Sequence, residues 1–387
     1  MPAVETVLVV GAGAAGAAAA ILLAEGGVQV DLVDIQPDVR TTGSGITLQG
    51  NALRVLESCG VWEDVRRAGY AFDELGIRAP DAEGTVVAVL ADIRTGGQHL
   101  PATLGVHRPT LARILVDQAK QVGVDVRFGT TFTAVDQRAD GVAVTFEDGT
   151  VTDYDLVIGA DGIRSWTRRL LGVPLETRGT GMGIWRAFVS RPPSVTRTDL
   201  VYGGPCYIAG YCPTGDDSLY AYLVEDAQDR STLAPDAALG VMRDLAASYH
   251  GPWDDIRARL TDPSTVNYTC FETHLLAAPW HRGRVVLAGD AVHACPPTLA
   301  QGAAQALEDA AVLAELLLGA DQPDQPDQPD QLARLDGLLD TYAARRLPRA
   351  TAVLDASLQV GTWMLAHERG DVPGLMGQIS TMLSVAP

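Results

Sequence analysis

The sequence predicts an α/β fold, in which an α+β unit is inserted into a parallel-sheet domain and helices follow at the C-terminal end. Residues 6–33 give a short apolar run, an alanine-rich helical segment and a second apolar run, which is the pattern of buried parallel strands joined by a helix. Residues 181–225 instead alternate apolar and polar side chains between Pro, Gly and Asp, which is typical of an antiparallel sheet. Residues 332–367 have a helical composition.

The remaining elements follow in order along the chain. Helices are predicted at residues 17–25, 51–68, 111–121, 237–249 and 301–318. Strands are predicted at residues 6–10, 28–33, 124–128, 155–160 and 284–288, and an alternating strand at residues 142–146 is followed by a hairpin signal. Strands of the inserted sheet are predicted at residues 184–189, 199–202, 207–212 and 219–224. The Asp-Gln-Pro repeat at residues 321–331 predicts an exposed linker. We expect helices at residues 332–349 and 351–367 with Pro348 as a kink or a break between them, and we expect the last residues to be loosely ordered.

The composition fits a globular protein and excludes several classes of partner. The 387 residues are 47% hydrophobic and carry a formal net charge of −19, which argues against nucleic acid and anionic membranes as partners. The five cysteines include no CxxC pair, so neither a disulfide framework nor a metal site is predicted. Reduced thiols, and a start that lacks a basic signal-peptide region, predict a cytoplasmic protein.

The turn between the first strand and the first helix has the GxGxxG pattern, with the residues Gly11, Ala12, Gly13, Ala14, Ala15 and Gly16. The first glycine allows a tight turn, the second lets the backbone approach a pyrophosphate, and the third lets helix and strand pack closely. Asp34 ends the next strand, close to the spacing expected for a carboxylate on a ribose hydroxyl. These features predict a Rossmann-like dinucleotide-binding unit.

Two later strands also end in an acidic motif. The strand at residues 155–160 is followed by Asp161-Gly162, and the strand at residues 284–288 by Gly289-Asp290. A proline pair and the start of a helix come next: Pro296, Pro297, Gly302, Ala303 and Ala304. No second GxGxxG opens a helix downstream, which is unlike enzymes that have two dinucleotide-binding domains.

The three motifs in this order resemble those of the single-component (class A) FAD-dependent aromatic hydroxylases, a family that includes para-hydroxybenzoate hydroxylase and salicylate hydroxylase. The resemblance spans roughly residues 4–357. It implies an FAD enzyme that takes NADH or NADPH and O2 and hydroxylates a small phenolic, aromatic-acid or heteroaromatic substrate through a flavin C4a-hydroperoxide. It also suggests a homodimer.

The resemblance assigns roles to the motif residues. Asp290 is similar to the family's aspartate on a ribityl hydroxyl of FAD, with Gly289 giving the backbone room. Pro296 and Pro297 resemble a proline pair over the isoalloxazine that shapes the oxygen-transfer site. The first turn of the following helix would direct N–H groups at flavin N1 and O2. That turn consists of Gly302, Ala303 and Ala304.

Other FAD contacts are implied in the same way. Asp161-Gly162 looks like the motif near the FAD and NAD(P)H pyrophosphates, and Arg108 is similar to an arginine on the flavin linker, with Arg40 a candidate of the same kind. The chain departs from the family's pattern at two positions. Ala300 replaces a common glycine, which would be awkward at a positive φ, and Asp34 replaces the more usual Glu.

Candidate substrate residues lie in the predicted antiparallel sheet, which should roof the flavin ring. Tyr202 falls near a substrate-binding tyrosine of the family, and Tyr211 and Tyr222 are candidates for a hydrogen bond to a ring hydroxyl. Arg186 is a candidate for pairing with a substrate carboxylate. A core tyrosine or a salt bridge within the sheet is the alternative reading for each.

The predicted domain limits interleave the two units. FAD-binding segments are expected at residues 1–70, 101–178 and 273–320, substrate-domain segments at 71–100 and 179–272, a linker at 321–331 and C-terminal helices at 332–387. Three alternatives stay open for the function. They are a flavin-dependent epoxidase or other flavoprotein oxidoreductase on the same scaffold, a non-catalytic escort-like binding protein, and a plain NAD-dependent dehydrogenase, which would leave both acidic motifs unexplained.

Overall fold

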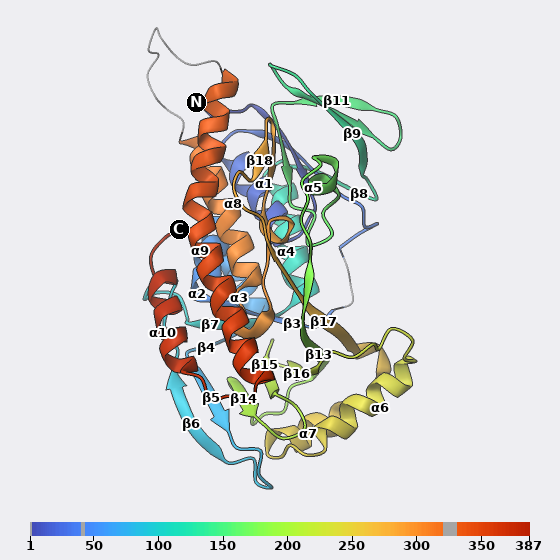
Figure 1. The fold of residues 1–387 in the computed structure, drawn as a ribbon, viewed down its shortest axis with the longest axis vertical. Coiled ribbons are helices and arrows are strands. Elements are labelled where there is room, and N and C mark those ends of the chain that lie inside the picture. Colours follow the sequence, from blue (N-terminus) through green and yellow to red (C-terminus); the bar gives the residue numbers. More distant parts are fainter. Residues whose placement is uncertain (1, 40–42, 320–330) are drawn as a thin grey trace.

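A computed structural model describes residues 2–39, 43–319 and 331–387 and contains two large sheets (Figure 1). The first is six-stranded, in the order β18-β19-β12-β1-β2-β8, and only its edge strand β18 is antiparallel. Its strands are β1 (Thr6–Val10), β2 (Gln29–Asp34), β8 (Asp125–Phe128), β12 (Leu156–Gly159), β18 (His281–Arg282) and β19 (Val285–Leu287). The predicted α/β class and its parallel sheet are confirmed.

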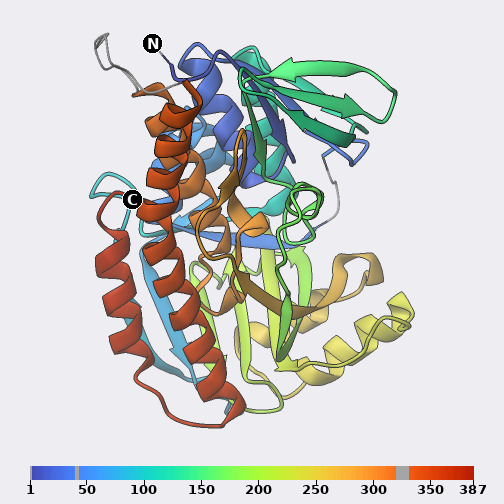
Figure 2. The ribbon, with the colours of Figure 1, turned by 45° about the horizontal axis from the view of Figure 1, so that its top comes forward.

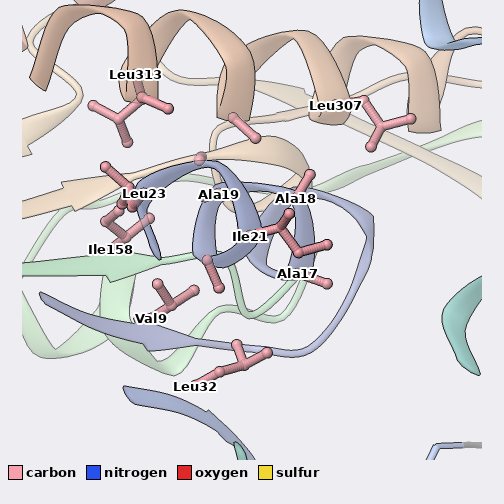
Figure 3. Packing of buried hydrophobic residues seen from close by; sticks show 14 of the residues in the cluster. Val9, Ala17, Ala18, Ala19, Ile21, Leu23, Leu32, Ile158, Leu307 and Leu313 are labelled. Carbon is pink, nitrogen blue, oxygen red and sulfur yellow. The ribbon is translucent and has the colours of Figure 1, made fainter. Parts of the chain in front are cut away.

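An alanine-rich helix packs on this sheet. Figure 3 shows α1 (Ala14–Glu25) between the strands that carry Val9, Leu32 and Ile158 and helix α8 (Gly302–Leu318), from which Leu307 and Leu313 point toward it. The alanines of α1 are almost wholly buried, and such small side chains allow the two helices to approach closely. The ends of both helices therefore have fixed positions above the sheet. Helix α4 (Arg108–Gln121) also packs against α1.

The second large sheet is eight-stranded, in the order β20-β17-β13-β16-β15-β14-β5-β6, and only the β14–β5 pair is parallel. One face packs on α6 (Pro235–Ala246) and α7 (Pro252–Arg259), seen beyond the sheet in Figure 2. The strands are β5 (Glu74–Arg78), β6 (Val86–Ala91), β13 (Arg178–Ser190), β14 (Thr198–Tyr202), β15 (Ile208–Pro213), β16 (Ser218–Asp226), β17 (Val266–Leu275) and β20 (His293–Ala294). The alternation at residues 181–225 thus predicted this sheet correctly.

The described residues also form two small three-stranded sheets. One, β11-β10-β9, consists of β9 (Phe132–Gln137), β10 (Val142–Phe146) and β11 (Val151–Tyr154), and the other, β3-β7-β4, of β3 (Gly45–Gln49), β4 (Tyr70–Phe72) and β7 (Thr103–His107). The shorter helices are α2 (Gly50–Ser58), α3 (Trp62–Ala68), α5 (Trp166–Leu170), η1 (Pro263–Thr265), η2 (Gly289–Ala291) and η3 (Pro297–Leu299).

Two helical expectations were wrong, and one of the two alternatives at Pro348 is excluded. The single helix expected at residues 51–68 is two helices, α2 and α3, because Gly60 has a positive φ of 71° that ends the first one. A break at Pro348 is absent, since α9 (Gln331–Leu365) is continuous through it, and a kink there stays a prediction. The last residues are not loosely ordered, because α10 (Val372–Leu383) forms there and lies beside α9 (Figure 1).

The eight-stranded sheet is built from segments far apart in the sequence, and its strands β17 and β20 lie at residues 266–275 and 293–294. Strands β5 and β6 come from the expected 71–100 segment, whereas β13 to β16 come from residues 178–226. The domain limits themselves stay a prediction. Residues 321–330 of the expected linker lie outside the described residues. In the described part of the chain, no helix is both long enough and apolar enough to cross a bilayer.

Candidate active site

A cavity of about 460 Å³ lies where the two large sheets meet. Its lining comes from the glycine-rich turn and α1, from β3, from the loop before α8, and from one face of the eight-stranded sheet. Residues almost 300 positions apart, such as Gly13 and Ala303, therefore share one wall.

The space around the glycines of the GxGxxG turn explains why Gly11 and Gly16 have no side chain. Gly11 has a φ of +103°, and a Cβ placed there would lie 2.4 Å from the carbonyl oxygen of Ala160. A Cβ on Gly16 would lie 1.9 Å from the carbonyl oxygen of Gly11, so close packing of helix and strand excludes any side chain. A Cβ on Gly13, by contrast, would meet nothing within 4 Å, and this residue lines the cavity. The turn thus leaves open space in front of its backbone.

The first turn of α1 faces the same space. Ala14 and Ala15 line the cavity, and α1 begins at Ala14. The first N–H groups of a helix have no carbonyl partner within it, and they carry the positive end of the helix dipole. Small side chains leave these groups accessible to a phosphate.

Asp34 supports the turn directly. One of its carboxylate oxygens accepts a hydrogen bond from the backbone N–H of Ala12 at 2.8 Å, and the other accepts one from Gln36 at 2.8 Å. These bonds tie the end of β2 to the glycine-rich turn. The expected contact of Asp34 with a ribose stays a prediction. Arg40 lies outside the described residues.

The two residues of the Asp161-Gly162 motif have different roles, because Asp161 holds a loop and Gly162 lines the cavity. The Asp161 carboxylate accepts hydrogen bonds from the Ser165 hydroxyl (2.5 Å) and from the backbone N–H of Thr167 (2.8 Å), so it holds the start of α5. Gly162 has a φ of +79° and lines the cavity, as does Arg108 from the start of α4. Gly162 and Arg108 thus face the predicted cofactor, whereas Asp161 holds the loop that presents Gly162.

Asp290 lines the cavity. Its only hydrogen bond among the described residues uses the backbone carbonyl, which accepts from His274, so the carboxylate oxygens are available as acceptors. Burial raises the pKa of Asp290, while the charges of His293 and Arg108 oppose that rise. Gly289 has a φ of +62°, and a Cβ there would press on the Cβ atoms of α1 and α8 at 3.0 and 3.3 Å.

A buried carboxylate fixes the Gly289-Asp290 loop from behind. Asp309 on α8 accepts from the backbone N–H of Gly289 at 2.8 Å, contacts His293 Nε2 at 2.6 Å, and binds Arg346 Nε at 2.7 Å. Burial alone would raise the pKa of Asp309, but the charges of His293 and Arg346 lower it to about 2. His293 is therefore a positioning residue in this loop.

A second buried acid extends this network to the C-terminal helices. Glu308 binds Arg346 at 2.9 Å and Arg349 at 2.7 Å, and it accepts from the Asn51 side chain at 3.1 Å. Arg349 also donates to the carbonyl oxygen of Met382 in α10 at 2.9 Å. The sequence analysis missed this network. Two adjacent acids inside the apolar segment 302–318 were the available signal.

The loop before α8 forms the cavity floor. Pro297 lines the main cavity, whereas Pro296 lines a smaller one behind it, next to β13 and α9. Ala300 has φ +53° and ψ +32°, so the expected positive φ at this position is present with alanine in place of glycine. Gly302 and Ala303 line the cavity at the start of α8, and Ala304 is buried in the core.

The eight-stranded sheet supplies the opposite wall, and its register decides which tyrosines face the cavity. Arg186 pairs with Tyr222, and Tyr222 pairs with Gly210, so these residues share one face. Tyr202 lies on the same face, and Arg186, Tyr202 and Tyr222 all line the cavity. Tyr211 follows Gly210 directly along β15, so its side chain lies on the opposite face of the sheet.

Tyr211 must therefore be removed from the candidate substrate residues. Its ring is buried among the residues that pack on α6 and α7, and its hydroxyl donates to Asp199 at 2.7 Å. Side chains alternate between faces along a strand, so a residue one position out of phase with Gly210 cannot reach the cavity. The Tyr222 ring leans over Gly210, where a Cβ would come within 2.4 Å of it.

The cavity also contains a carboxyl group that the sequence analysis missed. Asp92 follows β6 and accepts a hydrogen bond from the Thr103 hydroxyl at 3.2 Å. Burial raises the pKa of Asp92, the Thr103 hydrogen bond lowers it, and the nearby charge of Asp73 raises it further. No motif surrounds Asp92 in the sequence, so only the fold could reveal it.

The arrangement fits FAD by the chemistry of its donors and acceptors. The open space at Gly13 and the N-terminus of α1 suit a pyrophosphate, the free carboxylate of Asp290 suits a polyol hydroxyl, and the floor at Pro297 and Ala303 suits a flat ring. The remaining space beneath Tyr222 suits a second, smaller molecule against that ring.

Comparison with known proteins agrees with this assignment. Residues 5–357 match the family described as "FAD binding domain". The chain is 31% identical to the putative FAD-dependent monooxygenase YetM of Bacillus subtilis over 94% of this chain and 95% of that protein. It is 33% identical to the 2-heptyl-3-hydroxy-4(1H)-quinolone synthase of Pseudomonas aeruginosa over 80% of each chain. Klebsiella pneumoniae HpxO, solved with FAD and uric acid, has the same fold, with a TM-score of 0.80, 22% identity and coverage of 98% and 92%.

Proposed function

Because this chain belongs to the single-component FAD-dependent aromatic hydroxylases, we propose that it hydroxylates a small aromatic or heteroaromatic molecule bound between the flavin site and the eight-stranded sheet. The chain is a flavoprotein monooxygenase that binds FAD and takes NADH or NADPH as co-substrate. The observation that carries the proposal is a single cavity that reaches from Gly13 and Asp290 to Tyr202 and Tyr222. A substrate held by the sheet would therefore lie directly against the cofactor.

The residues around the cavity perform three tasks. The glycine-rich turn and Asp290 hold FAD, which supplies the redox chemistry and the activation of O2 when it is bound. The first turn of α8 presents N–H groups at Gly302 and Ala303, where they stabilise negative charge. Tyr222 and apolar side chains of the sheet keep water away from the reacting atoms.

The substrate class follows from the lining and from the relatives. Aromatic and aliphatic side chains such as Phe72, Leu200 and Phe271 suit a flat ring, and the Tyr202 and Tyr222 hydroxyls offer hydrogen bonds to its polar groups. The name of one relative describes a quinolone product, and HpxO binds uric acid, so both concern fused heteroaromatic rings. These points support a bicyclic heteroaromatic substrate for this chain. The five unpaired cysteines support a cytoplasmic location.

The test is a turnover assay on the FAD-loaded protein. Phenols, aromatic acids and hydroxylated heteroaromatics would be tested as substrates. For each one, the oxidation of NADH and NADPH and the uptake of O2 would be measured, and the mass of the product would be determined by mass spectrometry. We expect oxidation that the substrate stimulates and a product that gains one oxygen atom at a ring carbon. Oxygen gained across an alkene would instead identify an epoxidase. A protein that takes up no FAD, or that oxidises neither nucleotide with any compound, would refute the proposal.

A matched pair of variants tests which of two tyrosines faces the cavity. Tyr222→Phe and Tyr211→Phe each remove one hydroxyl from neighbouring strands of the same sheet, on opposite faces. We expect Tyr222→Phe to raise KM for the substrate, by about 5- to 10-fold for the loss of one neutral hydrogen bond. Tyr211→Phe should leave KM unchanged and should lower stability only. Equal effects of the two variants on KM would contradict the placement.

A further inference from the structure

Asp92 is a carboxyl group in the cavity wall that neither the FAD site nor the scaffold requires. Asp92 follows β6 of the eight-stranded sheet and is hydrogen-bonded to Thr103 of β7, which belongs to the β3-β7-β4 sheet. It therefore lies where these two sheets meet. One carboxylate oxygen accepts from the Thr103 hydroxyl, and the other has no hydrogen-bond partner in the described part of the chain. It caps no helix and no turn.

No cation within the described residues pairs with Asp92. Arg94, two positions away, binds Asp73 at 2.7 Å and the backbone carbonyl of Gln98 at 2.7 Å. The charge of Asp73, another acid, raises the pKa of Asp92 in addition to burial. Asp92 therefore faces the cavity without the charge partner that buried carboxylates usually have.

The position of Asp92 is nonetheless well fixed. Its backbone N–H donates to the carbonyl oxygen of Asp73 at 2.8 Å, and Asp73 in turn accepts from the backbone N–H of Ala102 at 2.8 Å. Thr103, which holds the side chain, is only 4% exposed. A group fixed in this way is preorganised as an acceptor, because little side-chain freedom is lost when a donor binds.

The cavity wall around this acceptor is apolar. Phe72, which pairs with Thr103, and Leu75, which pairs with Leu90, line the cavity from the two neighbouring strands. A carboxyl group in such surroundings gains most from a ligand that donates an N–H or O–H, and it disfavours a ligand that brings a second negative charge.

We propose that Asp92 is a specificity-determining residue that accepts a hydrogen bond from a ring N–H or O–H of the substrate. The substrate is then a heteroaromatic with such a donor on its edge, and an aromatic carboxylate cannot lie with its charge at this wall. Asp92 orients the ring and thereby selects which ring carbon faces the cofactor. This inference rests on the proposed function, because it concerns the same cavity.

The test compares two probes that differ in one donor. 4(1H)-Quinolone and its N-methyl derivative would be titrated into the FAD-loaded protein, with binding read from the change in flavin absorbance. We expect the N–H probe to bind about 10- to 100-fold more tightly, as a hydrogen bond to a charged acceptor would give. Asp92→Asn should reduce that preference to less than about threefold, because the amide is a weaker acceptor.

Two controls separate this role from a structural one. Asp140→Asn removes the same charge at an exposed loop position and should leave the preference intact. The unfolding midpoint and FAD affinity of Asp92→Asn should equal those of the natural protein. The proposal is overturned if Asp92→Asn keeps the full preference, if both probes bind equally to the natural protein, or if neither probe perturbs the flavin.

Failure here is distinguishable from failure of the proposed function. Donor-dependent binding that requires Asp92, without any oxygenated product, would sustain this inference and refute the hydroxylase assignment. Oxygenation of a ring without any preference for the N–H probe would do the reverse.

Discussion

Replacing Arg346 with methionine tests whether the buried ion network holds the cofactor loop. The guanidinium joins Glu308 at 2.9 Å and Asp309 at 2.7 Å, and all three side chains are fully buried. Without it, Glu308 keeps the charge of Arg349, whereas Asp309 keeps its contacts with the Gly289 N–H and with His293. Methionine fills much of the arginine volume, so the loss is mainly electrostatic.

The expected loss is large because two carboxylates lose a shared partner at a fully buried position. Removing one member of a buried pair costs about 3–5 kcal/mol of unfolding free energy. For a chain of 387 residues that unfolds as a unit, this corresponds to a fall in Tm of roughly 4–6 °C. FAD affinity should fall as well, because Asp309 positions the backbone of Gly289.

Denaturant unfolding and FAD titration would measure both effects. Arg345→Met is the matched control, since the neighbouring side chain binds Glu315 at 2.8 Å in a partly exposed pair. Such a pair contributes at most about 1 kcal/mol, so the control should lose little. A loss in Arg346→Met no greater than in Arg345→Met would refute the reasoning, because it would show that the buried charges have no need of this partner.

Three further outcomes follow from single residues. Gly11→Ala should abolish FAD binding and lower stability, because its Cβ would meet a carbonyl oxygen at 2.4 Å, whereas Gly13→Ala should fold normally and weaken FAD binding only. Ala300→Gly should change the unfolding free energy by less than about 1 kcal/mol, since relief at φ +53° is offset by a more flexible unfolded chain; a loss above about 2 kcal/mol would contradict this. The difference in unfolding free energy between the natural protein and Asp309→Asn should become smaller as pH falls from about 4 to about 2. The reason is that the pKa of Asp309 is about 2 in the folded protein and 3.8 when unfolded. A difference that does not depend on pH would contradict this prediction.

The sequence predicted those parts of the fold that depend on local pattern. The first strand, the glycine-rich turn and the alternating strands at residues 181–225 follow from hydrophobic period and turn chemistry, and the structure has them. The confirmed family and cofactor came from three short motifs. Whether the individual motif residues touch FAD stays a prediction.

Register was beyond the reach of the sequence. Tyr211 and Tyr222 look equivalent as sheet tyrosines, but their strands pair so that only Tyr222 faces the cavity. A shift of one residue in that pairing would exchange the two faces. Asp92 was missed for a related reason, since its role depends on β6 lying beside β7 in space.

Pro348 shows how packing can override a local rule. Proline inside a helix costs about 3 kcal/mol or more, which predicts a kink or a break at this position. Arg346 and Arg349 flank it on α9 and bind the same carboxylate, Glu308, at 2.9 and 2.7 Å. Glu308 lies on α8, so these two ion pairs tie residues on both sides of Pro348 to the same point of the neighbouring helix.

The contribution of α10 to the cavity sets an order of assembly during synthesis. Met376 lines the cavity, but the glycine-rich turn and the first turn of α8 leave the ribosome earlier. At about 5–20 residues per second, the roughly 70 residues from Gly302 to Met376 take several seconds to translate. The nascent chain therefore exposes its glycine-rich turn and the first turn of α8 before Met376 can complete the cavity wall.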